Sequence, residues 1–175
     1  MAVRFGLTAA ATALFLAATP VGGAVASPHD HHPGKGKGKP TAGARTLGDP
    51  LFPQIGNGGY DVKHYQIYLY YDPDTNTFKS ARTTIRATAL QTLKEFSLDF
   101  QALDVASVKV NGRTAAFSQV DATPQLSSNP AVTQPMKLVV NPHPSTWPKA
   151  GRTFTVEVRY SGTPEHITDV DESIE

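Results

Sequence analysis

The chain has 175 residues, with 16 lysines and arginines against 15 aspartates and glutamates, and its formal net charge is +1. It has no cysteine, which excludes disulfide bonds, thiolate catalysis and cysteine-based metal sites. From Asp49 onward, 11 Lys and Arg stand against 14 Asp and Glu, a net charge of −3, which argues against a nucleic-acid partner.

Residues 1–26 have the pattern of a cleaved signal peptide. Arg4 provides a short positive region, residues 7–18 form an apolar run, and Ala24-Val25-Ala26 resembles a cleavage site. The alternative, a membrane anchor, needs roughly 20 apolar residues, and Pro20 with the glycines after it interrupts the run early. We therefore expect a secreted, extracellular protein with no membrane span after signal cleavage.

Residues 27–48 are predicted to be a disordered His/Gly/Lys-rich linker, because they contain few apolar side chains and many Gly, Pro and Lys. Their lysines could contact anionic cell-wall polymers, and His29, His31 and His32 could bind a metal weakly. The histidines have no fixed geometry, however, and a solvated spacer explains the same composition. We therefore expect a spacer.

The ordered domain is predicted to cover residues 49–175. Leu51 and Phe52, beside two prolines, suggest an extended segment laid against the domain, and residues 56–59 a flexible entry to the first strand. Residues 60–71 and 77–89 alternate with a period of two around an acidic turn, which predicts a long hairpin. Each strand is expected to bury its more apolar face, which holds Tyr65, Ile67, Leu69 and Tyr71 in the first strand and Ala81, Thr83, Ile85, Ala87 and Ala89 in the second.

Further strands are predicted along the rest of the chain. Residues 96–100 alternate, residues 108–117 form a hairpin around Asn111-Gly112, and residues 136–140 and 154–160 are apolar strands separated by proline-rich turns. No helical periodicity follows the signal peptide. The predicted class is all-β: an antiparallel β-sandwich or saddle-like curved sheet of about seven or more strands.

No catalytic constellation can be assembled from the sequence. It has no Gly-x-Ser-x-Gly elbow, no phosphate-binding glycine loop and no His-Glu-x-x-His helix. His64 is expected at a surface or an edge, and His143 and His166 in proline-rich loops. No residue is therefore assigned to catalysis or to metal binding, and the substrate-binding residues stay unknown.

Two clusters are weaker candidates. Glu165 and His166, with Asp169, Asp171 and Glu172 after them, could bind calcium only if several oxygens converged, so a solvated tail is expected. Tyr60, Tyr68 and Tyr70 could stack sugars or peptides, although aromatic residues on strands more often form cross-strand pairs.

Four segments carry a resemblance: Asp49-Pro-Leu-Phe-Pro-Gln-Ile-Gly-Asn-Gly-Gly-Tyr-Asp-Val-Lys-His-Tyr65, the turn Tyr71-Asp-Pro-Asp-Thr-Asn76, Phe96-Ser-Leu-Asp-Phe100 and Phe154-Thr-Val-Glu-Val-Arg-Tyr-Ser-Gly-Thr-Pro164. The part of the first segment from Gly56 to Tyr65 is the most specific. Together they resemble the N-terminal β-domain of secreted bacterial zinc aminopeptidases of the aminopeptidase N type, which are gluzincin metallopeptidases. The resemblance implies a saddle-like β-domain placed before a thermolysin-like catalytic domain. That second domain holds zinc through His-Glu-x-x-His and a downstream Glu, and recognises the substrate amine through Gly-x-Met-Glu-Asn.

None of these zinc or substrate motifs occurs in the sequence, so we expect no cofactor in this chain and no hydrolysis by it alone. The sequence stops at Glu175 where family members continue, which predicts a fragment truncated before the catalytic domain. Its function would be to pack on that missing domain and help bound the substrate cleft, so that peptides are bound only through the other domain. The alternative is a free-standing exported β-sandwich module that binds a protein, a glycan or a cell-wall polymer.

Overall fold

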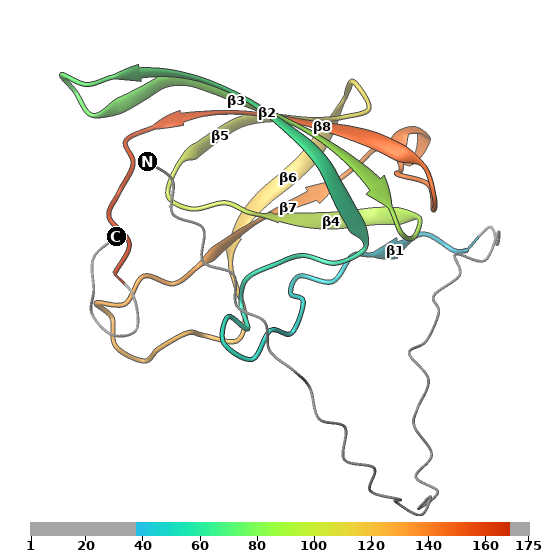
Figure 1. The fold of residues 1–175 in the computed structure, drawn as a ribbon, viewed down its shortest axis with the longest axis horizontal. Helices are drawn as coiled ribbons and strands as arrows, with labels where there is room; N and C mark the ends of the chain where they lie inside the picture. Colours follow the sequence, from blue (N-terminus) through green and yellow to red (C-terminus); the bar gives the residue numbers. More distant parts are fainter. Residues whose placement is uncertain (1–37, 169–175) are drawn as a thin grey trace, which may run out of the picture. The chain divides into compact units, whose positions relative to one another are not determined.

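A computed structural model describes residues 38–168 of the chain, and the predicted signal peptide, residues 27–37 and residues 169–175 lie outside the described residues. The described part forms one eight-stranded sheet in the order β1-β4-β7-β6-β5-β8-β3-β2 (Figure 1). The strands are β1 (Thr41–Ala42), β2 (Tyr60–Asp72), β3 (Thr77–Ala89), β4 (Leu93–Asp99), β5 (Asp104–Val110), β6 (Arg113–Asp121), β7 (Met136–Asn141) and β8 (Thr153–Gly162), with a 3-10 helix at Pro144–Thr146. Within these residues, no helix has the length and apolar character that a membrane crossing requires.

The predicted all-β class and curved sheet are confirmed. The sheet curls so strongly that strands distant in its order meet across its inner face. Phe96 on β4 lies 5.7 Å from Phe154 on β8 and 5.9 Å from Tyr60 on β2, measured between ring centroids in edge-to-face contacts. The half-barrel encloses one core, built mainly from the inward side chains of β3, β4, β5, β7 and β8.

The local strand predictions hold well. β5 and β6 pair around Asn111 and Gly112, whose φ angles of 50° and 80° suit a tight hairpin turn. On β8, Phe154, Val156 and Val158 are buried as expected, and β3 buries Ala81, Ile85, Ala87 and Ala89. These strands are read correctly because their alternating faces cover the core.

The prediction of a disordered linker at residues 27–48 is wrong at Thr41 and Ala42. Thr41 and Ala42 form β1, which pairs in parallel with β4 and makes the sheet mixed. Gly43 is buried, and a Cβ there would lie 2.5 Å from the Gly58 carbonyl oxygen. Composition identified a segment too polar to build a core, but backbone hydrogen bonds to β4 need no apolar side chains.

Residues 56–59, predicted to be a flexible entry, are fastened to the outer surface of β4 and β7. The carboxylate of Asp99 accepts hydrogen bonds from the Gly56 amide and from the Asn57 side chain, at 3.1 and 2.9 Å. The ammonium of Lys137 donates to the Gly56 carbonyl at 2.9 Å and forms an ion pair with Asp99. Because this loop covers them, Ser97 and Lys137 are buried although they point away from the core.

Candidate functional site

The apolar face of β2 is uncovered along most of its length. Tyr65, Ile67 and Leu69 stand opposite Ile85, Thr83 and Ala81 of β3, so they lie on the same inner face of the sheet as the core. Their exposed fractions are nevertheless 53%, 56% and 54%. We call these three side chains the inner patch. The prediction that this face of β2 is buried is therefore wrong, and Tyr71 is also 44% exposed.

Sheet order explains the exposure. β2 is the last strand of the sheet, and only its first residues, Tyr60 and Val62, pack against the core. Beyond them the strand continues along the hairpin drawn in green in Figure 1, past the part of the sheet that curls over the core. Alternation shows which side chains share a face, but it does not show whether another layer covers that face.

A cavity of about 230 Å³ continues from the inner patch toward the core. Tyr65 lines its edge, and Ile85, Leu98, Phe100 and Tyr160 line its wall. Phe100 and Tyr160 are only partly buried and meet edge to face, with ring centroids 5.3 Å apart. The cavity is also lined by the polar side chains of Asn57, Thr83 and Asp99. Patch and cavity together therefore present large apolar side chains beside a few polar groups, a mixture suited to contact with another protein surface.

Tyr60 closes the inner end of this surface. Its hydroxyl donates a 2.7 Å hydrogen bond to the Ser97 carbonyl oxygen. Burial raises the pKa of this phenol well above its ordinary value of 10.0, and the nearby Tyr65 and Asp99 raise it further. The hydroxyl therefore stays protonated in the folded chain and serves as a hydrogen-bond donor.

The free energy of unfolding at high pH should depend on the ionisation of Tyr60. Its raised pKa favours the neutral phenol in the folded state, so the stabilisation is complete below pH 10 and is lost as the pH rises above it. We expect the free energy of unfolding to fall by about 1.4 kcal/mol per pH unit there, beyond the background from groups that titrate equally in both states. Urea denaturation between pH 9 and 11.5 measures this slope. Tyr60→Phe should remove it and Tyr70→Phe should keep it, whereas equal slopes in both variants would contradict the assignment.

The tyrosine face expected from the sequence is not formed as predicted. A bulge between Val62 and His64 shifts the register of β2, so that Tyr60 turns into the core while Tyr68 and Tyr70 stay on the opposite, outer face. One extra residue in a strand reverses the faces of all residues beyond it. Tyr68 and Tyr70 remain together, on strand positions next to β3.

The titratable residues singled out in the sequence do not converge. His64 is exposed on edge strand β2, as predicted. His143 lies in its proline-rich loop, where its ring Nδ1 accepts a hydrogen bond from the Ser145 amide at 3.2 Å. Glu165 and His166 are exposed, while His29, His31, His32, Asp169, Asp171 and Glu172 lie outside the described residues. Across residues 38–168 no group of three or more metal-ligating side chains is found.

A second difference concerns the segment before β2. Leu51 and Phe52 were expected to lie against the domain, but they are 80% and 60% exposed. The carboxylate of Asp49 instead accepts hydrogen bonds from their backbone amides, at 2.8 and 3.1 Å. A local turn therefore shapes this segment, and its apolar side chains remain on the surface.

Solved structures of M1 zinc metallopeptidases are similar to this chain. The enzyme from Deinococcus radiodurans, in a mutant bound to a Tyr-Ser-Ala substrate, is 27% identical with a TM-score of 0.54, and the match covers 69% of this chain and 24% of that one. A two-domain M1 zinc metallopeptidase mutant bound to L-arginine is 27% identical with a TM-score of 0.55, over 71% of this chain and 25% of that one. The chain thus spans about a quarter of the matched proteins, in their N-terminal part. No family model and no curated protein matches it. The resemblance to a domain of zinc metallopeptidases of the aminopeptidase N type is confirmed.

Proposed function

Because this chain is similar to the N-terminal part of M1 zinc metallopeptidases, we propose that it is the non-catalytic N-terminal domain of a secreted zinc-dependent aminopeptidase. In that enzyme it packs on the catalytic domain through the inner patch and helps to bound the cleft in which peptides bind. The zinc ion, the activated water and the recognition of the substrate amine belong to the other domain. This chain contributes a wall of the cleft.

The observation that carries the proposal is the uncovered inner patch. Its three large side chains share a face with the core, and one of them, Tyr65, lines a cavity that the partly buried rings of Phe100 and Tyr160 also line. Burying the exposed half of each would be worth about 1 kcal/mol, so the patch favours a permanent partner. A catalytic domain in the same polypeptide is a partner that is always within reach.

Export is the second part of the proposal. It is supported by the positive, apolar and small-residue regions of residues 1–26. The absence of cysteine is compatible with an oxidising or a reducing compartment, since a core of this size does not require disulfide bonds.

The proposal is tested by the transcript downstream of the Glu175 codon. We expect it to encode His-Glu-x-x-His, in the same frame or after a frameshift. The joined polypeptide should hydrolyse alanyl and leucyl anilides in a zinc-dependent way, and residues 1–175 alone should not. A downstream sequence without the motif, or zinc-dependent turnover by the isolated chain, would contradict the proposal.

The role of the inner patch is tested in the joined polypeptide. Ile67→Asp should lower its stability by about 2 kcal/mol or more, because the substitution removes apolar contact and places a carboxylate at the interface. His64→Asp is the matched control: it adds the same charge on the same strand, but on the opposite face. Thermal unfolding followed by circular dichroism measures both, and equal losses would show that the patch is not the contact surface.

A further inference from the structure

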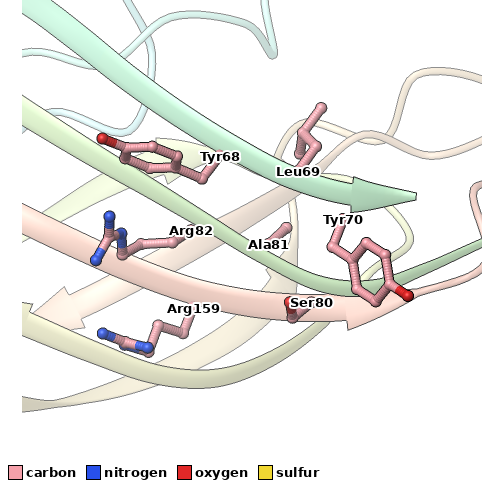
Figure 2. Close-up of a pocket in the computed structure, with 7 residues that line it drawn as sticks. All are labelled: Tyr68, Leu69, Tyr70, Ser80, Ala81, Arg82 and Arg159. Atoms are coloured by element: carbon pink, nitrogen blue, oxygen red, sulfur yellow. The ribbon is translucent and has the colours of Figure 1, made fainter.

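The outer face of β2, β3 and β8 contains a pocket that the proposed function does not use. Its volume is about 330 Å³, and its lining includes Tyr68, Tyr70, Ser80, Arg82 and Arg159 (Figure 2). We call it the arginine pocket. Figure 2 shows the guanidinium groups of Arg82 and Arg159 extending in the same direction from neighbouring strands, with the Tyr68 ring over Arg82.

The two arginines form an unfavourable pair. They stand directly opposite each other across β3 and β8, and like charges at such positions repel. Arg159 is partly neutralised by Glu157, whose carboxylate accepts a 3.0 Å hydrogen bond from Nε. Arg82 has no acidic partner among the described residues, and its Nε is buried without a hydrogen-bond acceptor. A buried donor without an acceptor is rare in folded proteins, and a cation without an acidic partner favours an anionic ligand.

Aromatic side chains hold the pocket in shape. The guanidinium carbon of Arg82 lies 4.5 Å from the centroid of the Tyr68 ring, within the range of a cation–π contact. Gln66 donates a 2.8 Å hydrogen bond to the Tyr68 hydroxyl. At the other end of the pocket, Tyr70 is 67% exposed and offers a flat ring to solvent. The pocket therefore combines a positioned cation with a free aromatic face.

We propose that the arginine pocket binds an acidic glycan through one of its carboxylate groups. The planar fork of an arginine matches a carboxylate with two parallel hydrogen bonds, and the second guanidinium adds charge. The exposed Tyr70 ring packs against the C–H face of the sugar that carries or follows the carboxylate. The domain from Asp49 onward has a net charge of −3, so the attraction is local to this pocket.

Calorimetric titration of the full chain with hexagalacturonate, an oligomer of a carboxylated sugar, tests the proposal. We expect saturable binding, with no binding of neutral maltohexaose at the same concentration. Arg82→Gln should weaken the affinity about tenfold or more, because it removes a charge-assisted hydrogen-bonded pair. Tyr70→Ala should weaken it by a smaller factor without changing the charge.

Two controls separate the pocket from general electrostatic attraction. Arg152→Gln makes the same charge change at an exposed turn before β8 and should leave the affinity within about a factor of two. Changing Lys35, Lys37 and Lys39 together to Gln should have an equally small effect. Binding that survives Arg82→Gln, or falls equally in all three variants, would overturn the proposal. Binding of linear polyphosphate as tight as that of hexagalacturonate would also overturn it, since the pocket would then recognise negative charge without selecting a sugar.

Discussion

Replacing Phe96 by alanine is expected to lower the free energy of unfolding by about 3–5 kcal/mol, the range for a large aromatic side chain removed from a core. Phe96 is 1% exposed, and its ring meets those of Tyr60 and Phe154 edge to face. These contacts join β4 to β2 and β8 across the curled sheet. Removing the ring would leave a cavity between these strands and weaken the contact between the two ends of the sheet. Urea denaturation followed by circular dichroism measures the loss.

Phe52→Ala is the matched control for this substitution. Phe52 is 60% exposed, so the same chemical change should alter the free energy of unfolding by about 0.5 kcal/mol or less. Comparable losses in the two variants would show that Phe96 does not hold the curl together.

Asp99→Asn is expected to destabilise the domain by about 3 kcal/mol, because it leaves the ammonium of Lys137 without its carboxylate. The Lys137 side chain is only 2% exposed, and its other hydrogen bond goes to the Gly56 carbonyl oxygen. A buried charge without a partner is costly because it has lost its solvation by water. The substitution also weakens the hydrogen bonds that the Asp99 carboxylate accepts from Gly56 and Asn57, so residues 56–59 should become looser. Hydrogen exchange at the Gly56 amide should therefore accelerate in this variant.

Lys137→Met should cost less, about 1 kcal/mol, although it breaks the same ion pair. The remaining Asp99 side chain is 40% exposed, so water can solvate its carboxylate, and methionine keeps most of the buried volume. The double variant should lie close to Lys137→Met. If Lys137→Met proved more destabilising than Asp99→Asn, buried packing rather than charge pairing would govern this contact.

The features that sequence alone predicts best are local. The Asn111-Gly112 turn and the alternation of β8 were read correctly, because a turn needs only its own φ angles and a strand's face needs only its period of two. The resemblance to zinc metallopeptidases was also recognised from short segments, and the solved structures bear it out.

The features that sequence missed all depend on distant contacts. β1 is held by backbone pairing with β4, which leaves no apolar pattern in Thr41 and Ala42. The bulge that turns Tyr60 inward has no signature in the surrounding residues. Lys137 reads as a solvent-facing residue of β7, and only the loop laid over it makes it buried.

The candidate site shows the same division. Alternation correctly grouped Tyr65, Ile67 and Leu69 on one face, but it predicted that the face was buried. The pairing of Arg82 with Arg159 could not be seen either, since these residues are far apart in the chain and meet only when β3 and β8 pair. Each pocket or patch is a property of register and sheet order.

The sequence by itself determined an all-β chain without thiol chemistry, the positions of most strands and turns, and the likeness to the N-terminal part of a zinc peptidase. Only the tertiary structure decided which apolar face stays uncovered and which arginines become neighbours. The physical reason is that propensity and periodicity act over a few residues, whereas burial and charge pairing depend on what the curl of the whole sheet places on each surface.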